Sequence, residues 1–153
     1  MKSAILSVIH VSQAAFGIYN LYLASISISN LQGYEDMSKK GAKYSSTAEQ
    51  QLHKTRTTQA SGTIALLFSV VSSIYLIFGS PGMGALQGVA GVNLLALVAA
   101  RKHVGDFWKS KARVPVPGVG DYNEATKDTQ EVRLNLAYLI GSWLAVGAVD
   151  FFV

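Results

Sequence analysis

Charged residues are missing from three long stretches of the chain. No Asp, Glu, Lys or Arg occurs from residue 3 to 34 or from residue 57 to 100, and Asp150 is the only one after residue 133. A helix needs about 20 mostly apolar residues to cross a bilayer. The first and last stretches each fit one such helix. The middle stretch fits two, with a break at GSPGMG, residues 79–84, because clusters of Gly and Pro mark turns.

This pattern predicts an all-α fold, a polytopic membrane protein built as a four-transmembrane-helix bundle. Soluble core helices are the alternative, but they carry a polar face that these stretches lack. A cleaved signal peptide is a second alternative for the first stretch, but its apolar run continues to about Ser29, which is long for such a peptide and favours a retained helix. We expect a single membrane domain over residues 1–153, with helices at about 3–29, 60–79, 83–100 and 133–152 and loops at about 30–59 and 101–132.

The basic residues predict the orientation of the bundle. Twelve of the 13 Lys and Arg residues lie in two segments, 39–56 and 101–133, which four spans place on one side. The positive-inside rule puts that side in the cytoplasm. The termini then face the lumen or the exterior, and we expect an integral protein of the endoplasmic reticulum or another endomembrane.

The basic loops do not indicate a nucleic-acid partner. One loop carries five basic and three acidic residues and the other seven and five, so each has a net charge of only +2. Attraction to the anionic headgroups of the lipid bilayer explains these loops better.

Local signals refine the loops. Residues 46–49, STAE, have the spacing of a capping box and predict that the second helix starts near Thr47, outside the membrane. Residues 128–131, DTQE, have the same spacing and predict the start of the last helix. Phe107-Trp108, among lysines and arginines, is typical of an interfacial anchor. Residues 114–122, VPVPGVGDY, are expected to be non-helical, as a connector or as a flap over a cytoplasmic opening.

Polar and small residues form stripes along the predicted helices. Those of the first helix are spaced alternately by three and four, which is the spacing of a packing seam. Polar groups need a partner inside a membrane, so this stripe should face the bundle interior. The first stripe is His10, Gln13, Gly17, Asn20, Ala24 and Ser27. The corresponding residues of the other helices are Gly62, Ala65, Ser69 and Ser72; Gly84, Gly88 and Gly91; and Gly141, Ala145 and Ala148.

The polar residues of three helices predict a pocket in the luminal half of the bundle. Asp150 is the only acid outside the two loops, and we expect it to pair with His10 at a similar depth, as the catalytic residues. Packing alone is the alternative role for these side chains. The residues expected to bind a substrate are Gln13, Asn93, Gln87, Asn20 and Tyr138.

The candidate chemistry is narrow. The absence of cysteine excludes disulfides, thiolate catalysis and cysteine metal sites. HExxH, GxSxG and P-loop motifs are missing, and the three histidines are dispersed, so we expect no metal and no cofactor. A His/Asp pair in a low-dielectric pocket suits acid–base chemistry on a lipophilic small molecule, such as cyclisation, isomerisation or epoxide opening.

Two other functions fit the same pattern. One is a non-catalytic accessory or scaffold subunit of a membrane protein complex, and the other is a small carrier or channel acting as a homo-oligomer. In size and layout the chain resembles the membrane-associated glutathione and eicosanoid enzymes. Residues 49–61, EQQLHKTRTTQAS, contain Arg56 and Gln59 but no second Arg and no Glu inside the span. No site residue is therefore carried over from that resemblance.

Overall fold

Four long helices make up the protein, seen in a computed structural model. The structure describes residues 2–42, 46–79, 81–109 and 120–152. The helices are α1 (Lys2–Ala42), α2 (Ser46–Phe78), α3 (Met83–Trp108) and α4 (Gly120–Phe152). Each is long and apolar enough to cross a membrane, and the described ranges contain no strand. The predicted all-α four-helix bundle is confirmed.

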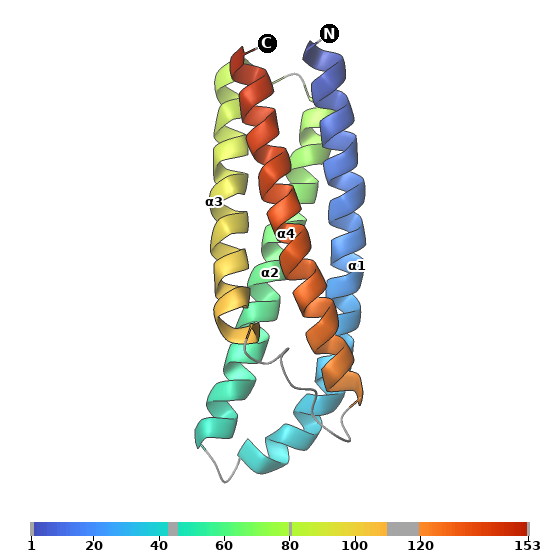
Figure 1. Cartoon of the computed structure of the whole chain (residues 1–153), viewed down its shortest axis with the longest axis vertical. Helices are drawn as coiled ribbons and strands as arrows, with labels where there is room; N and C mark the ends of the chain where they lie inside the picture. Colours follow the sequence, from blue (N-terminus) through green and yellow to red (C-terminus); the bar gives the residue numbers. More distant parts are fainter. Residues whose placement is uncertain (1, 43–45, 80, 110–119, 153) are drawn as a thin grey trace.

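The helices run alternately up and down, with neighbours in the sequence packed side by side (Figure 1). α1 and α3 each contact α2 and α4, and within the described ranges α1 and α3 lie diagonally opposite without contact. Both chain termini lie at the same end of the bundle as the α2–α3 turn, and we call this the terminal end. The charged segments lie at the other end, the basic end. Both basic segments therefore share one side, as the four-span prediction requires.

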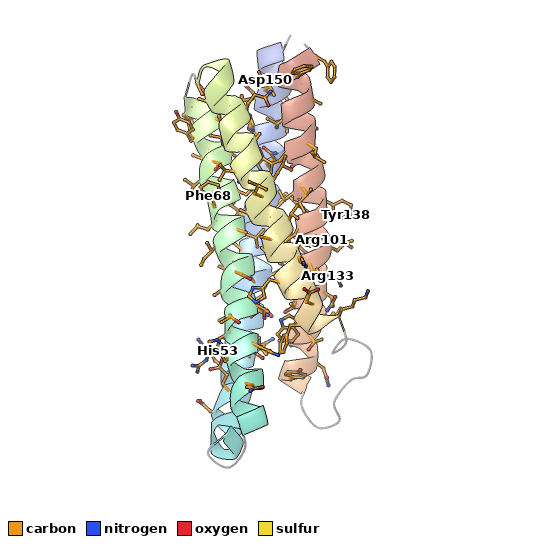
Figure 2. All side chains as sticks on the ribbon, turned by 90° about the vertical axis from the view of Figure 1, so that its left-hand side faces the viewer. His53, Phe68, Arg101, Arg133, Tyr138 and Asp150 are labelled. Carbon is orange, nitrogen blue, oxygen red and sulfur yellow. The ribbon has the colours of Figure 1, made fainter. Side chains whose placement is uncertain are left out.

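The outer surface of the bundle is apolar. Large side chains such as Val8, Leu67 and Leu95 are more than half exposed. Phe68 lies at the outer edge of α2, where it is labelled in Figure 2. Such a surface would be unfavourable in water and suits contact with lipid tails. It supports an integral membrane protein.

The helices extend beyond the predicted spans. α1 continues to Ala42, and α2 begins at Ser46, close to the predicted start. The predicted start of the last helix at residues 128–131 is wrong, because α4 begins at Gly120. Of the segment expected to be non-helical, residues 120–122 are helical and residues 114–119 lie outside the described ranges. Hydropathy marks the crossing of the bilayer, whereas charged residues such as Glu and Lys continue a helix readily.

The predicted stripes of α1 and α2 are confirmed as packing seams. All six residues of the α1 stripe are buried, and so are the four of the α2 stripe. Gly17 shows why a small residue is needed. A Cβ built on Gly17 would lie 2.5 Å from Cγ2 of Val70, so a larger side chain would push α1 and α2 apart.

The predicted seams of α3 and α4 are wrong. A Cβ built on any of the α3 glycines Gly84, Gly88 and Gly91, or on Gly141 of α4, would meet no atom within 4 Å. Ala145 and Ala148 are exposed. Larger side chains fill the space between these helices and leave the small residues outside. The buried seam of α3 is Leu86, Ala90, Asn93, Leu97, Ala100 and Val104, and that of α4 is Val132, Leu136, Leu139, Trp143, Val146 and Asp150.

Trp108 is a core residue of the basic end, so the predicted interfacial anchor is wrong there. Its side chain is 0% exposed, and its indole Nε1 donates a 2.8 Å hydrogen bond to Oγ1 of Thr58. It packs with Leu31 and Tyr122 in a second hydrophobic cluster. Trp108 thereby joins α3 to the other three helices near the basic end.

We predict that Gly17→Leu destabilises the bundle by about 1–3 kcal/mol, since it overpacks the contact between α1 and α2. Gly88→Leu is the matched control. It makes the same change of side chain in a helix but faces open space, so its effect should stay within about 0.5 kcal/mol. Thermal unfolding in detergent, followed by circular dichroism, measures the difference. Equal Tm values for the two variants would contradict the packing described here.

Candidate functional site

His10 lies inside the bundle with one ring nitrogen bonded and the other bare. It is 2% exposed, and its Nδ1 lies 2.8 Å from Oε1 of Gln13, one helical turn further along α1. An amide oxygen only accepts hydrogen bonds, so Nδ1 carries the proton. In the neutral ring, Nε2 then has a free lone pair, and it has no hydrogen-bond partner within the described ranges.

Gln13 connects His10 to two neighbouring helices. Its Nε2 donates to Oγ of Ser142 on α4 at 3.0 Å. Its Oε1 accepts a longer bond, 3.4 Å, from Oγ of Ser73 on α2. Gln13 is 2% exposed, so these bonds are shielded from competing water. The tautomer of His10 is therefore held by a network that spans three helices.

Trp143 of α4 packs against the His10 ring. Its ring centroid lies 5.9 Å from that of His10, and its indole Nε1 donates a 2.9 Å bond to Oγ of Ser69. It is 0% exposed. The imidazole thus lies against an aromatic ring in an environment with few polar groups beyond the network itself.

An apolar groove opens beside this layer, between α1 and α4. Its volume is about 310 Å³, and Gln13 and Ser142 contribute polar atoms to its lining. Apolar side chains, among them Phe16 and Leu139, line most of the remainder. A lipophilic molecule could enter from the bilayer and reach the Gln13 amide. His10 itself is not among the lining residues, so it lies behind Gln13.

Asp150 lies apart from His10, which corrects the expected pairing. The carboxylate Oδ2 of Asp150 accepts a 2.9 Å bond from Nε2 of Gln87 on α3. Neither ring nitrogen of His10 bonds to it, since Nδ1 is bonded to Gln13 and Nε2 has no partner among the described residues. At about 1.5 Å per residue, His10 lies about 12 Å along α1 from the terminal end, whereas Asp150 lies only about 3 Å from the end of α4. Figure 2 places Asp150 close to that end. The two groups share one half of the membrane but not one layer.

The other predicted substrate-binding residues are dispersed. Asn20 and Asn93 are 0% exposed, and each donates its amide N–H to the carbonyl oxygen four residues earlier, of Phe16 and Val89 respectively. The Oδ1 atom of each has no partner in the part of the chain described. Tyr138 is 61% exposed, packs edge-on against Phe16 and lines the apolar groove. Of the predicted set, His10 and Gln13 are brought together, Tyr138 lines the same groove as Gln13, and Gln87 and Asp150 form a second pair. Asn20 and Asn93 bond only to their own helices among the described residues.

Sequence reasoning missed the partners of this network. The sequence pattern does not mark Ser142, Ser73 or Trp143, since none of them falls on a predicted stripe. The signal that could have found Trp143 is its place in the α4 seam, two turns from Leu136 and Asp150. Among the residues that the structure describes, no three His, Asp or Glu side chains converge closely enough to hold a metal ion.

No protein-family model matches this chain, and no curated protein or solved structure matches it either.

We predict that ¹⁵N NMR of the labelled protein in detergent shows Nδ1 of His10 as the protonated nitrogen and Nε2 as the bare one. Gln13→Leu removes the acceptor and should release this preference. It should also destabilise the fold by about 1–3 kcal/mol, the cost of a buried donor without a partner. Gln32→Leu, on the exposed face of the same helix, is the control. A protonated Nε2 in the wild type would refute the assigned tautomer.

Proposed function

We propose that this protein is a membrane-embedded enzyme that acts on a lipophilic small molecule by acid–base chemistry, with His10 as the base. The observation that carries the proposal is the bare, buried Nε2 of His10. A buried acceptor without a partner is costly, and intramembrane ionisable residues are kept mainly where they function.

The α1–α4 groove supplies the binding site in this proposal. It is mostly apolar, it faces the bilayer, and Gln13 and Ser142 offer polar contacts at one place in its lining. Binding sites for small molecules commonly combine an apolar wall with a few polar groups that set orientation. Because His10 lies behind Gln13, the substrate reaches Nε2 only if the side chains lining the groove move.

The chemistry needs only a proton that is taken and returned. Nε2 accepts a proton from a carbon or hydroxyl of the substrate, and the imidazolium is stabilised by the Nδ1–H bond to Gln13. The same nitrogen then returns the proton to another substrate atom. This sequence is balanced for an isomerisation or a cyclisation without a cofactor. Asp150 is hydrogen-bonded to Gln87, away from His10. We therefore propose its catalytic role separately from that of His10.

We predict that native mass spectrometry of the gently released protein detects a bound molecule that is not a phospholipid. His10→Asn and Ser142→Leu should lose it, and His53→Asn, which changes an exposed histidine at the basic end, should retain it. Asp150→Asn tests whether the acid contributes. A wild-type protein that carries no such molecule, or one that His10→Asn retains unchanged, would overturn the proposal.

A scaffold subunit is the second candidate, favoured by the exposed glycine face of α3. Gly84 and Gly88 are exposed with open space above them, so another membrane helix could approach closely there. In this case Gly88→Leu would abolish a protein complex seen by native electrophoresis of solubilised membranes. His10→Asn would leave that complex intact. A wild-type protein without such a complex, or a complex that Gly88→Leu leaves intact, would contradict the scaffold candidate.

The orientation is a further part of the proposal, with both termini luminal in an endomembrane such as the endoplasmic reticulum. The chain has no cysteine, so single cysteines can report sidedness without a background. We predict that in sealed microsomes an impermeant maleimide labels Gln50→Cys at the basic end but not Gly82→Cys in the α2–α3 turn. Labelling of Gly82→Cys but not of Gln50→Cys would show the opposite orientation, with both termini cytoplasmic.

A further inference from the structure

A second groove, between α3 and α4 at the basic end, is lined by four cations. Its volume is about 580 Å³, and its apolar lining includes Val98 and Ile140. The lining contains one acid, Asp106. The four cations are Arg101, Lys102, Lys109 and Arg133.

The cations of this groove outnumber its acids. Among the side chains that the structure describes, none of the four forms an ion pair within 4.0 Å. Nε of Arg101 is buried and has no hydrogen-bond partner in the same part of the chain. A buried guanidinium N–H without an acceptor is costly, and an anionic oxygen would satisfy it.

Arg133 is held in place on the same groove. A Cβ built on Gly105 of α3 would lie only 3.0 Å from Nε of Arg133, so the arginine lies directly across the α3 backbone. Its Nη1 donates a 2.7 Å bond to Oε1 of Gln130. Gln130 in turn donates to the carbonyl oxygen of Trp108 at 2.9 Å. This arginine is therefore positioned before any ligand binds.

The position of the groove matches the edge of a membrane. Arg101 lies about 27 Å along α3 from its start at the terminal end, and the hydrocarbon core of a bilayer is about 30 Å thick. Figure 2 shows Arg101 and Arg133 at neighbouring levels, below Tyr138 and above the lower ends of the helices. The cations thus lie at headgroup depth, and Val98 and Ile140 offer apolar surface for an acyl chain.

We propose that this groove binds the phosphate of one anionic phospholipid, with Arg101 and Arg133 as its main ligands. Both guanidinium groups can bind phosphate through two hydrogen bonds. Basic pockets between transmembrane helices suit such headgroups. The apolar surface favours a lipid over a free phosphate ion. This inference is independent of the chemistry proposed for His10.

The test is native mass spectrometry of the protein released from nanodiscs of phosphatidylcholine and phosphatidylserine in equal amounts. The wild type should retain one phosphatidylserine. Arg101→Gln/Arg133→Gln should weaken that retention by at least about tenfold. Lys54→Gln/Lys127→Gln, which removes the same charge from exposed positions at the same end, should retain it.

Two further measurements keep the outcome decisive. If the double arginine variant does not fold, Lys102→Gln/Lys109→Gln replaces it, since both lysines are exposed. Glycerol phosphate is added as a soluble competitor. Loss of phosphatidylserine at equimolar glycerol phosphate would mean that the site takes free phosphate esters, and the lipid assignment would be overturned. The site itself would be overturned if the Lys54→Gln/Lys127→Gln control lost phosphatidylserine as much as the groove variant did. It would also be overturned if the wild type showed no preference for phosphatidylserine.

Discussion

The side-chain amide of Gln13 is the contact on which the interior of this bundle depends. Membrane helices gain little from the hydrophobic effect when they associate, because lipid tails are as apolar as their own side chains. Close packing and buried hydrogen bonds must therefore set which faces meet. Gln13 bonds to its own helix through His10, to α2 through Ser73 and to α4 through Ser142. A rotation of α1 would break the contacts to α2 and α4 together.

A second polar layer holds the same three helices nearer the basic end. Oγ of Ser27 on α1 bonds to the carbonyl oxygen of Ala125, and Nε2 of Gln59 on α2 donates a 2.7 Å bond to Oγ1 of Thr129 on α4. α3 is held to its neighbours differently. Trp108 bonds to Thr58 of α2 near the basic end, and Gln87 bonds to Asp150 of α4 at the terminal end. Its buried Asn93 donates only within its own helix. α3 therefore relies more on apolar packing, although its glycines Gly84 and Gly88 are exposed.

The two grooves divide the protein into regions of different chemistry. The α1–α4 groove lies beside the buried imidazole of His10, whose Nδ1 is hydrogen-bonded to Gln13. The α3–α4 groove lies at the basic end and is lined by four cations and one acid. Both share α4, so the helix that positions Ser142 also positions Arg133, about two and a half turns away. A lipid bound at the basic end would brace α4 against α3, whereas the candidate substrate would lie on the opposite face of α4.

Spacing along α1 was enough to identify its buried face, because one stripe of polar and small residues runs from His10 to Ser27 while most other positions of that stretch are apolar. The same reasoning failed for α3 and α4. Glycine and alanine are tolerated both in seams and against lipid. The large side chains that fill these interfaces, such as Leu97 and Trp143, cannot be told from lipid-facing apolar residues in the sequence.

The sequence by itself determined the number of spans, their alternating direction and the burial of His10 and Gln13, since each follows from the cost of polar groups in lipid. Only the tertiary structure decided which polar groups meet. A hydrogen bond forms only when two side chains lie at the same depth and point toward each other. The rotation that decides where they point depends on how each helix packs against two neighbours at once. For that reason Asp150 meets Gln87 rather than His10, and Arg101 and Arg133, 32 positions apart, share one groove.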